Sequence, residues 1–179
     1  MTEIIASDGQ KTLLGASFLL QYPNEEWYEE RSQWQVELET IGKEQWRSAL
    51  IDVLDYTVEQ GKKEYEEEYV RAFDFSKNTH LYLSSHEFND QGKQAEELIQ
   101  YKAFYMENGV DVVNELPDYL PALLELCGHI PPEKSLKILQ YAMPKLKVLR
   151  ERLIEGKLPQ AYVLDVVLSV VNGWEEAFV

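Results

Sequence analysis

The sequence predicts an all-α protein, a single-domain bundle of about eight helices that spans residues 1–179. Three observations carry this prediction. Apolar residues recur at helical spacing in almost every segment, and proline or glycine separates most of these segments. The β-branched run from Val163 to Val171 also keeps helical spacing, as far as Trp174, and is too long for an ordinary strand. No internal repeat, glycine/serine linker or shift in composition marks a domain boundary.

The first predicted helix carries an apolar stripe and ends at a proline. Leu13, Ala16 and Leu20 lie on one face, and Ser7 with Gln10 has the spacing of a capping box that opens the helix. The helix ends at Tyr22, because the residue before a proline is disfavoured in the α region.

Asn24 is a suitable N-cap for the second helix, and Gly61 a suitable C-cap for the third. The stripe expected to be buried in the second helix is Trp27, Trp34, Leu38 and Ile41. The corresponding stripe in the third is Trp46, Leu50, Val53, Leu54 and Thr57.

The fourth and fifth predicted helices flank the longest connection, Asp74–Asn89. A link of this length is unusual between bundle helices and is often functional. On the fourth helix the apolar face is Tyr65, Tyr69, Ala72 and Phe73. On the fifth, residues 90–108, the residues expected to point inward are Leu98, Ile99, Tyr105 and Met106.

The last three helices are predicted at about 120–127, 133–155 and 160–177. The sixth has the most regular stripe of the chain, formed by Leu120, Leu123, Leu124 and Cys127. Before it, Asp118 is expected to cap the helix and Pro117 to keep the chain extended. Pro144 should kink or break the seventh helix.

The charge of the chain excludes one large class of partner. Acidic residues outnumber basic ones by 32 to 17, for a net charge of −15. A field of this sign repels phosphate backbones and anionic membranes, so we expect no nucleic acid and no stable membrane insertion. With a single cysteine and no secretory signal at the N-terminus, we expect a soluble protein in the cytoplasm, monomeric or dimeric.

No motif in the sequence indicates an enzyme, a metal site or a bound cofactor. His80, His86, Cys127 and His129 do not form a ligand pattern, and residues 9–12 match only the end of a phosphate-binding loop. Runs of glutamate, such as Glu66, Glu67 and Glu68, are typical of a solvated helix face. Beside aromatic residues, however, they also suit a groove that takes a basic amphipathic helix. A generic adaptor for such helices, and a small enzyme using His86 with Glu87 or Asp118, stay open as alternatives.

Four segments resemble those of the NarJ-type chaperones, within the wider TorD-like family of molybdoenzyme maturation factors. They occur in the family's order and are residues 19–23 (LLQYP), 69–74 (YVRAFD), 81–86 (LYLSSH) and 115–125 (ELPDYLPALLE). Two positions depart from the family pattern. Tyr119 stands where many relatives have histidine, and Gln94-Ala95 where an arginine-glycine pair is common.

This resemblance implies a dedicated, all-helical cytoplasmic chaperone of respiratory nitrate reductase. Such proteins bind the basic N-terminal leader of the catalytic (alpha) subunit and keep that subunit competent for insertion of the molybdenum–guanine-dinucleotide cofactor. The predicted peptide-binding residues are Tyr69, Phe73, His86, Pro117, Asp118, Tyr119, Glu66, Glu67 and Glu68.

Overall fold

The computed structural model describes residues 2–86 and 91–178, with the side chains from Ser7 onward, and confirms the all-α fold. Apart from one isolated β-bridge, the regular structure of these residues is helical. The helices are α1 (Thr2–Leu20), α2 (Glu25–Glu39), α3 (Glu44–Gln60), α4 (Lys62–Tyr69), α5 (Gln91–Glu107), α6 (Leu120–His129), α7 (Pro132–Glu155) and α8 (Gln160–Ala177). A π-helical turn, η1 (Val70–Asp74), extends α4, and a 3₁₀ turn, η2 (Leu83–Ser85), lies in the long connection.

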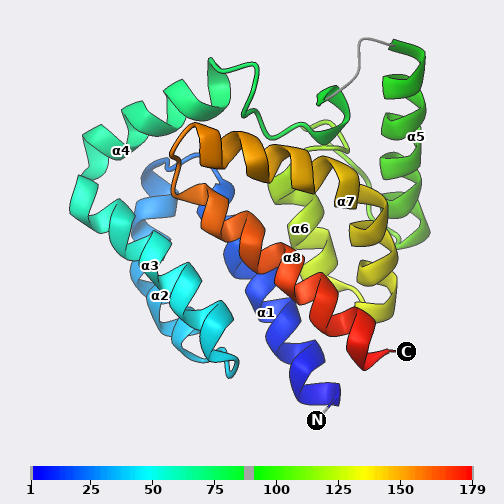
Figure 1. Ribbon diagram of the computed structural model, residues 1–179, viewed down its shortest axis with the longest axis horizontal. Helices are drawn as coiled ribbons and strands as arrows, with labels where there is room; N and C mark the ends of the chain where they lie inside the picture. Colours follow the sequence, from blue (N-terminus) through cyan, green and yellow to red (C-terminus); the bar gives the residue numbers. More distant parts are fainter. Residues whose placement is uncertain (1, 87–90, 179) are drawn as a thin grey trace.

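The core forms around α1, which packs against α6 and α8, while α7 and α3 pack on α8 (Figure 1). The stripes predicted for the third, fourth and sixth helices are all buried. On α6, the side chains of Leu120, Leu123, Leu124 and Cys127 are fully buried. In the described residues, no helix is long and apolar enough to cross a membrane.

The predicted caps at Asn24 and Gly61 are present, whereas the capping box at Ser7 is not. The side chain of Asn24 accepts a hydrogen bond from the backbone N–H of Trp27 at 2.9 Å, as an N-cap does. Gly61 ends α3 with a φ of +83°, in the region that favours glycine. The capping box at Ser7 is wrong, because α1 already begins at Thr2 and Ser7 lies inside it.

Pro144 does not break the seventh helix. The α7 helix continues across it from Pro132 to Glu155, and Figure 1 shows a change of direction between its yellow first half and its orange second half. A bend is the expected result of a proline inside a helix, since proline lacks the N–H that would bond one turn back.

The helix α5 lies at the edge of the molecule (Figure 1), and its predicted inward face is partly wrong. Ile99 and Met106 are 69% and 64% exposed, whereas Tyr101 and Tyr105 are buried. Tyr101 meets an aromatic neighbour on this side, since its ring lies 5.3 Å from that of Tyr141 on α7. Asp90, the predicted first residue of this helix, lies outside the described residues.

Candidate peptide-binding surface

The long connection after α4 is joined to the start of α6 by backbone hydrogen bonds. The N–H of Leu83 donates to the carbonyl of Asp118 at 3.1 Å, and the N–H of Leu120 donates to the carbonyl of Leu81 at 2.8 Å. These bonds flank the isolated bridge between Tyr82 and Tyr119. Two segments that the resemblance singled out therefore lie side by side.

Asp118 strengthens this junction and does not cap α6. One carboxylate oxygen, Oδ2, accepts from the backbone N–H of Ser84 at 3.0 Å and from its hydroxyl at 2.6 Å. The side chain of Asp118 is only 1% exposed, and α6 begins without a side-chain cap. The predicted capping role is therefore wrong, because the carboxylate bonds the 3₁₀ turn from the neighbouring segment.

Pro117 is also placed differently from the prediction. The N–H of Tyr119 donates to the carbonyl of Leu116 at 3.1 Å, which closes a turn with Pro117 in its second position. Proline suits that position, because its fixed φ matches the one a common β-turn requires. The chain before α6 is therefore turned rather than extended.

His86 is fully buried, and both of its ring nitrogens are engaged. Nε2 lies 2.8 Å from the carbonyl oxygen of His80, which only accepts, so Nε2 carries the proton. Nδ1 then accepts from the guanidinium of Arg152. Burial lowers the pKa of His86 to about 4, so the ring is neutral near pH 7. Both nitrogens are therefore engaged in this conformation, and the carboxylate of Asp118 bonds Ser84 and not His86. Glu87, the other partner named for His86 in the enzyme alternative, lies outside the described residues.

Tyr69, Phe73 and Tyr119 belong to one group of aromatic side chains. The hydroxyl of Tyr69 donates to the carbonyl of Leu20 at 2.6 Å, and its ring lies 4.7 Å from that of Phe73. Burial, followed by the nearby Tyr119, raises the pKa of Tyr69 well above its usual range. Tyr119 is half-buried and lies against Tyr82, with the ring centroids 5.1 Å apart.

The three glutamates do not share one environment. Glu66 and Glu67 line a shallow groove of about 350 Å³, together with Tyr22, Val70 and Arg71. Glu68 instead accepts from the hydroxyl of Tyr56 at 2.8–2.9 Å and borders a different hollow. We name the first feature, lined by these five residues, the α4 groove.

No group of three histidine, cysteine or acidic side chains that could hold a metal ion occurs within residues 2–86 and 91–178. Cys127 is buried, and burial raises the pKa of its thiol. His129 is exposed in the last turn of α6. The buried thiol and the exposed imidazole therefore do not form a reactive pair in this conformation.

The sequence reasoning missed the two basic residues of α7 that support His86. Lys145 is 4% exposed; its ammonium group donates to the carbonyl of His86 at 2.6 Å and pairs with Glu97 of α5 at 3.1 Å. Arg152 donates to the His86 ring. A signal was present, because Lys145 falls on the buried stripe of α7 between Ala142 and Leu149.

With this geometry in place, comparison with known proteins gives the family. Residues 41–153 match the model of the family described as "Nitrate reductase delta subunit". The chain belongs to that family. Every residue of the predicted peptide-binding set lies inside the matched range.

The chain is also similar to three curated proteins whose names refer to nitrate reductase. The chain is 30% identical over 168 residues to the probable nitrate reductase molybdenum cofactor assembly chaperone NarJ of Bacillus subtilis, covering 93% of this chain and 91% of that protein. It is 27% identical to the probable chaperone NarW of Escherichia coli, with 59% of this chain and 46% of NarW covered. The nitrate reductase-like protein NarX of Mycobacterium tuberculosis is also 27% identical, and the match covers 62% of this chain and 17% of NarX. The resemblance to NarJ-type chaperones is confirmed.

Proposed function

We propose that this chain is a dedicated assembly chaperone of respiratory nitrate reductase. It binds the basic N-terminal leader of the catalytic subunit in the cytoplasm and assists insertion of the molybdenum cofactor, without itself being an enzyme. One observation carries the proposal: the similarity to a probable nitrate reductase molybdenum cofactor assembly chaperone extends over 93% of this chain and 91% of the relative. A similarity that is nearly complete in both chains supports a shared role for the whole domain.

The charge and the α4 groove support a basic leader as the ligand. The net charge of −15 attracts a cationic segment from solution, and Glu66 and Glu67 place part of that charge beside the apolar surfaces of Tyr22 and Val70. Of the other predicted residues, the half-buried Pro117 and Tyr119 can touch a partner in this conformation. In the same conformation, the buried ones would act by holding this surface in shape: Tyr69, Phe73, His86 and Asp118.

Calorimetric titration with a synthetic leader of the cognate catalytic subunit tests the proposal. We expect saturable, one-to-one binding that weakens as salt rises, because part of the attraction is between opposite charges. A scrambled peptide of the same composition is the control. Equal binding of both peptides would indicate a generic adaptor for basic amphipathic helices, and no binding of the leader would contradict the proposed function.

The acidic run should steer association more than it holds the complex. Changing Glu66, Glu67 and Glu68 to glutamine together should slow association and flatten its salt dependence, with little change in dissociation. Most of this effect should come from Glu66 and Glu67, since Glu68 is occupied by Tyr56. Stopped-flow association rates for Glu66→Gln/Glu67→Gln and for Glu68→Gln separate the two contributions. Equal rates in all variants would leave the run as a solvated helix face.

A further inference from the structure

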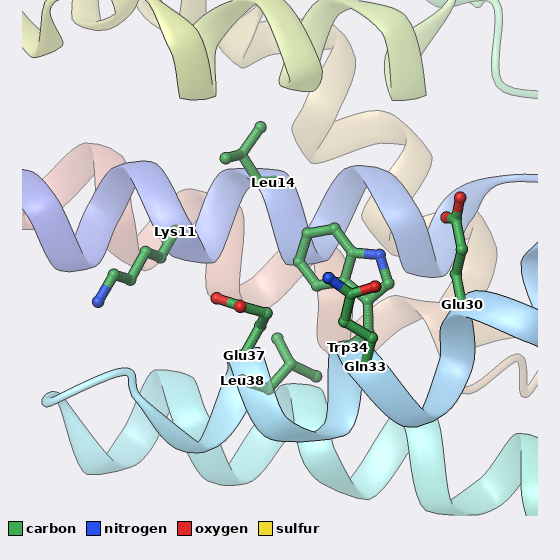
Figure 2. Close-up of a pocket in the computed structure, with 7 residues that line it drawn as sticks. All are labelled: Lys11, Leu14, Glu30, Gln33, Trp34, Glu37 and Leu38. Atoms are coloured by element: carbon green, nitrogen blue, oxygen red, sulfur yellow. The ribbon is translucent and has the colours of Figure 1, made fainter.

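A second groove, between α1 and α2, combines an apolar floor with an acidic rim. It is a hollow of about 350 Å³ whose apolar lining comes mainly from Trp34 and Leu38 of α2. Leu14 of α1 borders it, with its side chain directed away from α2 in Figure 2. Figure 2 shows Trp34 standing between the two helices, with Lys11 and Glu30 toward opposite ends. We name this feature the α1–α2 groove; it shares no lining residue with the α4 groove.

The helices α1 and α2 approach closely at Gly15, beside this groove. A Cβ added there would lie 2.6 Å from Cδ2 of Leu38, so a larger residue would force the Leu38 side chain to move. The ring of Trp34 packs 5.1 Å from Phe18, which in turn stacks on Trp27 at 4.7 Å. A preformed aromatic floor of this kind loses little conformational entropy when a partner binds.

Trp34 differs from the other tryptophans of the chain in a way that indicates a partner. Trp27, Trp46 and Trp174 are buried, whereas Trp34 is half-buried at the groove. Within the described residues its indole N–H has no hydrogen-bond partner in the protein, which is also true of the fully buried Trp174. The N–H groups of Trp27 and Trp46 donate to the carbonyl of Phe18 and the hydroxyl of Ser169, each at 2.8 Å. Trp34 is thus the half-buried tryptophan whose donor is available. A partly open tryptophan with an available donor is the kind of side chain that dominates binding energy at protein interfaces.

The charges around the groove are mainly negative and favour a basic occupant. The α2 helix carries six glutamates and one arginine. Two of those glutamates, Glu30 and Glu37, line the groove, against one cation, Lys11 of α1. They are two helical turns apart, about 10 Å along the axis. An amphipathic helix with an apolar residue between two lysines or arginines matches this pattern. A second copy of this chain does not, because its net charge is −15.

We propose that the α1–α2 groove is a docking site for a basic amphipathic helix, which inserts an apolar side chain against Trp34 and places basic residues beside Glu30 and Glu37. This inference rests on the proposed function in one respect: it takes the leader of the catalytic subunit as the helix that occupies the groove. The site is separate from the surface at Pro117 and Tyr119 that the sequence resemblance pointed to. In this inference the glutamates of the α4 groove attract the leader from solution and do not hold it.

Calorimetry with the synthetic leader compares variants of the two sites. We expect Trp34→Ala to weaken binding by about tenfold or more, as removal of a central interface tryptophan does. Glu30→Gln/Glu37→Gln should weaken binding at low salt and reduce its salt dependence. The matched controls on the far side of α2 are Val36→Ala and Glu29→Gln/Glu39→Gln; they should bind within about twofold of the wild type, since rim and remote residues contribute little.

Fluorescence supplies a readout that does not depend on the stability of the Trp34→Ala variant. Because the other three tryptophans are buried, a leader that covers Trp34 should shift the emission of the wild type, and the shift should be lost in Trp34→Phe. A shift that persists in Trp34→Phe would overturn the proposed site.

Three further results would overturn the inference. If Tyr119→Ala abolishes leader binding while Trp34→Ala leaves it unchanged, the leader binds elsewhere and the proposed function survives. If wild-type protein self-associates in sedimentation and Trp34→Ala does not, the groove is an interface between copies of this chain. If the leader does not bind the wild type at all, both the groove assignment and the proposed function fail.

Discussion

The helices α6 and α5 are both predicted from apolar residues at helical spacing, yet they contribute differently to the fold. The α6 helix packs between α1 and α7, and its stripe of leucines is fully buried. The α5 helix lies at the edge of the molecule (Figure 1), its large aliphatic residues Ile99 and Met106 face outward, and tyrosines form its inner face. The difference shows that an amphipathic pattern establishes a helix but does not say which neighbour covers it.

The buried face of α5 contains several polar atoms, so few interactions hold this helix against α7. Within the part of the chain that the structure describes, the hydroxyls of Tyr101 and Tyr105 are buried without a hydrogen-bond partner, as is the Oε2 atom of Glu97. The Oε1 atom of Glu97 pairs with Lys145 of α7 at 3.1 Å. Unpartnered buried polar atoms destabilise an interface. We therefore expect α5 to be the least firmly held helix and α6 to be among the most firmly held.

The largest difference should come from truncating one side chain on each helix. Leu124→Ala on α6 should lower the free energy of unfolding by about 3–5 kcal/mol, since it leaves a cavity in a close-packed core. Ile99→Ala on α5 should change it by less than about 0.5 kcal/mol, because that side chain is exposed. Urea denaturation of both variants measures the contrast. Similar losses would mean that α5 is as much a part of the core as α6.

Removing the charge that holds α5 should have the next largest effect. Lys145→Met keeps most of the side-chain volume but leaves Glu97 without its ionic partner. We expect the free energy of unfolding to fall by about 2–3 kcal/mol. This is less than for a fully buried pair, because Glu97 is partly exposed. Amide hydrogen exchange should accelerate in α5 before it does in α6. Lys147→Met, at an exposed position on the same helix, is the control and should change neither quantity. If the amide groups of α5 exchange at the same rate in Lys145→Met as in the wild type, the packing of the tyrosines alone holds α5 in place.

The neutral His86 predicts a loss of stability in mild acid. Its pKa in the folded protein is about 4, mainly because of burial, against an ordinary value of 6.5. The unfolded chain therefore binds the proton more readily. The stabilisation is complete above pH 6.5 and is lost as the pH falls from 6.5 toward 4.

Between pH 7 and pH 5 this loss amounts to about 2 kcal/mol. His80, Arg152 and Lys145 face the same ring, and their positive charges act in the same direction as burial. Chemical denaturation at a series of pH values compares the wild type with His86→Gln, which cannot titrate at this position. If the two proteins lose stability in parallel across this range, the carboxylates and not His86 set the pH dependence.

The smallest expected effect concerns the junction between η2 and α6. Asp118→Asn should lower stability by about 1 kcal/mol, since a neutral amide oxygen replaces the charged acceptor of two hydrogen bonds to Ser84. A double-mutant cycle with Ser84→Ala should give a coupling energy of similar size. Simple helix capping predicts little loss, because asparagine caps as well as aspartate does. A coupling energy near zero would contradict the assigned role.

These contrasts also show what the sequence could predict. The stripes of α3 and α6, the cap at Asn24 and the bounds of α8 depend on local spacing, and all were predicted correctly. The roles of Asp118 and Lys145 were not predicted. Asp118 bonds Ser84, 34 positions away in the chain, and Lys145 bonds His86, 59 positions away. Local patterns do not encode which distant backbone group a buried polar side chain will meet. Motif resemblance singled out two segments, residues 81–86 and 115–125, that the fold places side by side. Their part in peptide binding stays a prediction.

The central claim is that this chain assists molybdenum cofactor insertion into nitrate reductase. The most direct test is the molybdenum content of the catalytic subunit, purified from host cells that have or lack this chain and measured per mole of subunit. The account predicts that the subunit accumulates with most of its molybdenum missing when the chain is absent, and that re-expression of the chain restores the metal. Equal molybdenum content with and without the chain would contradict the account.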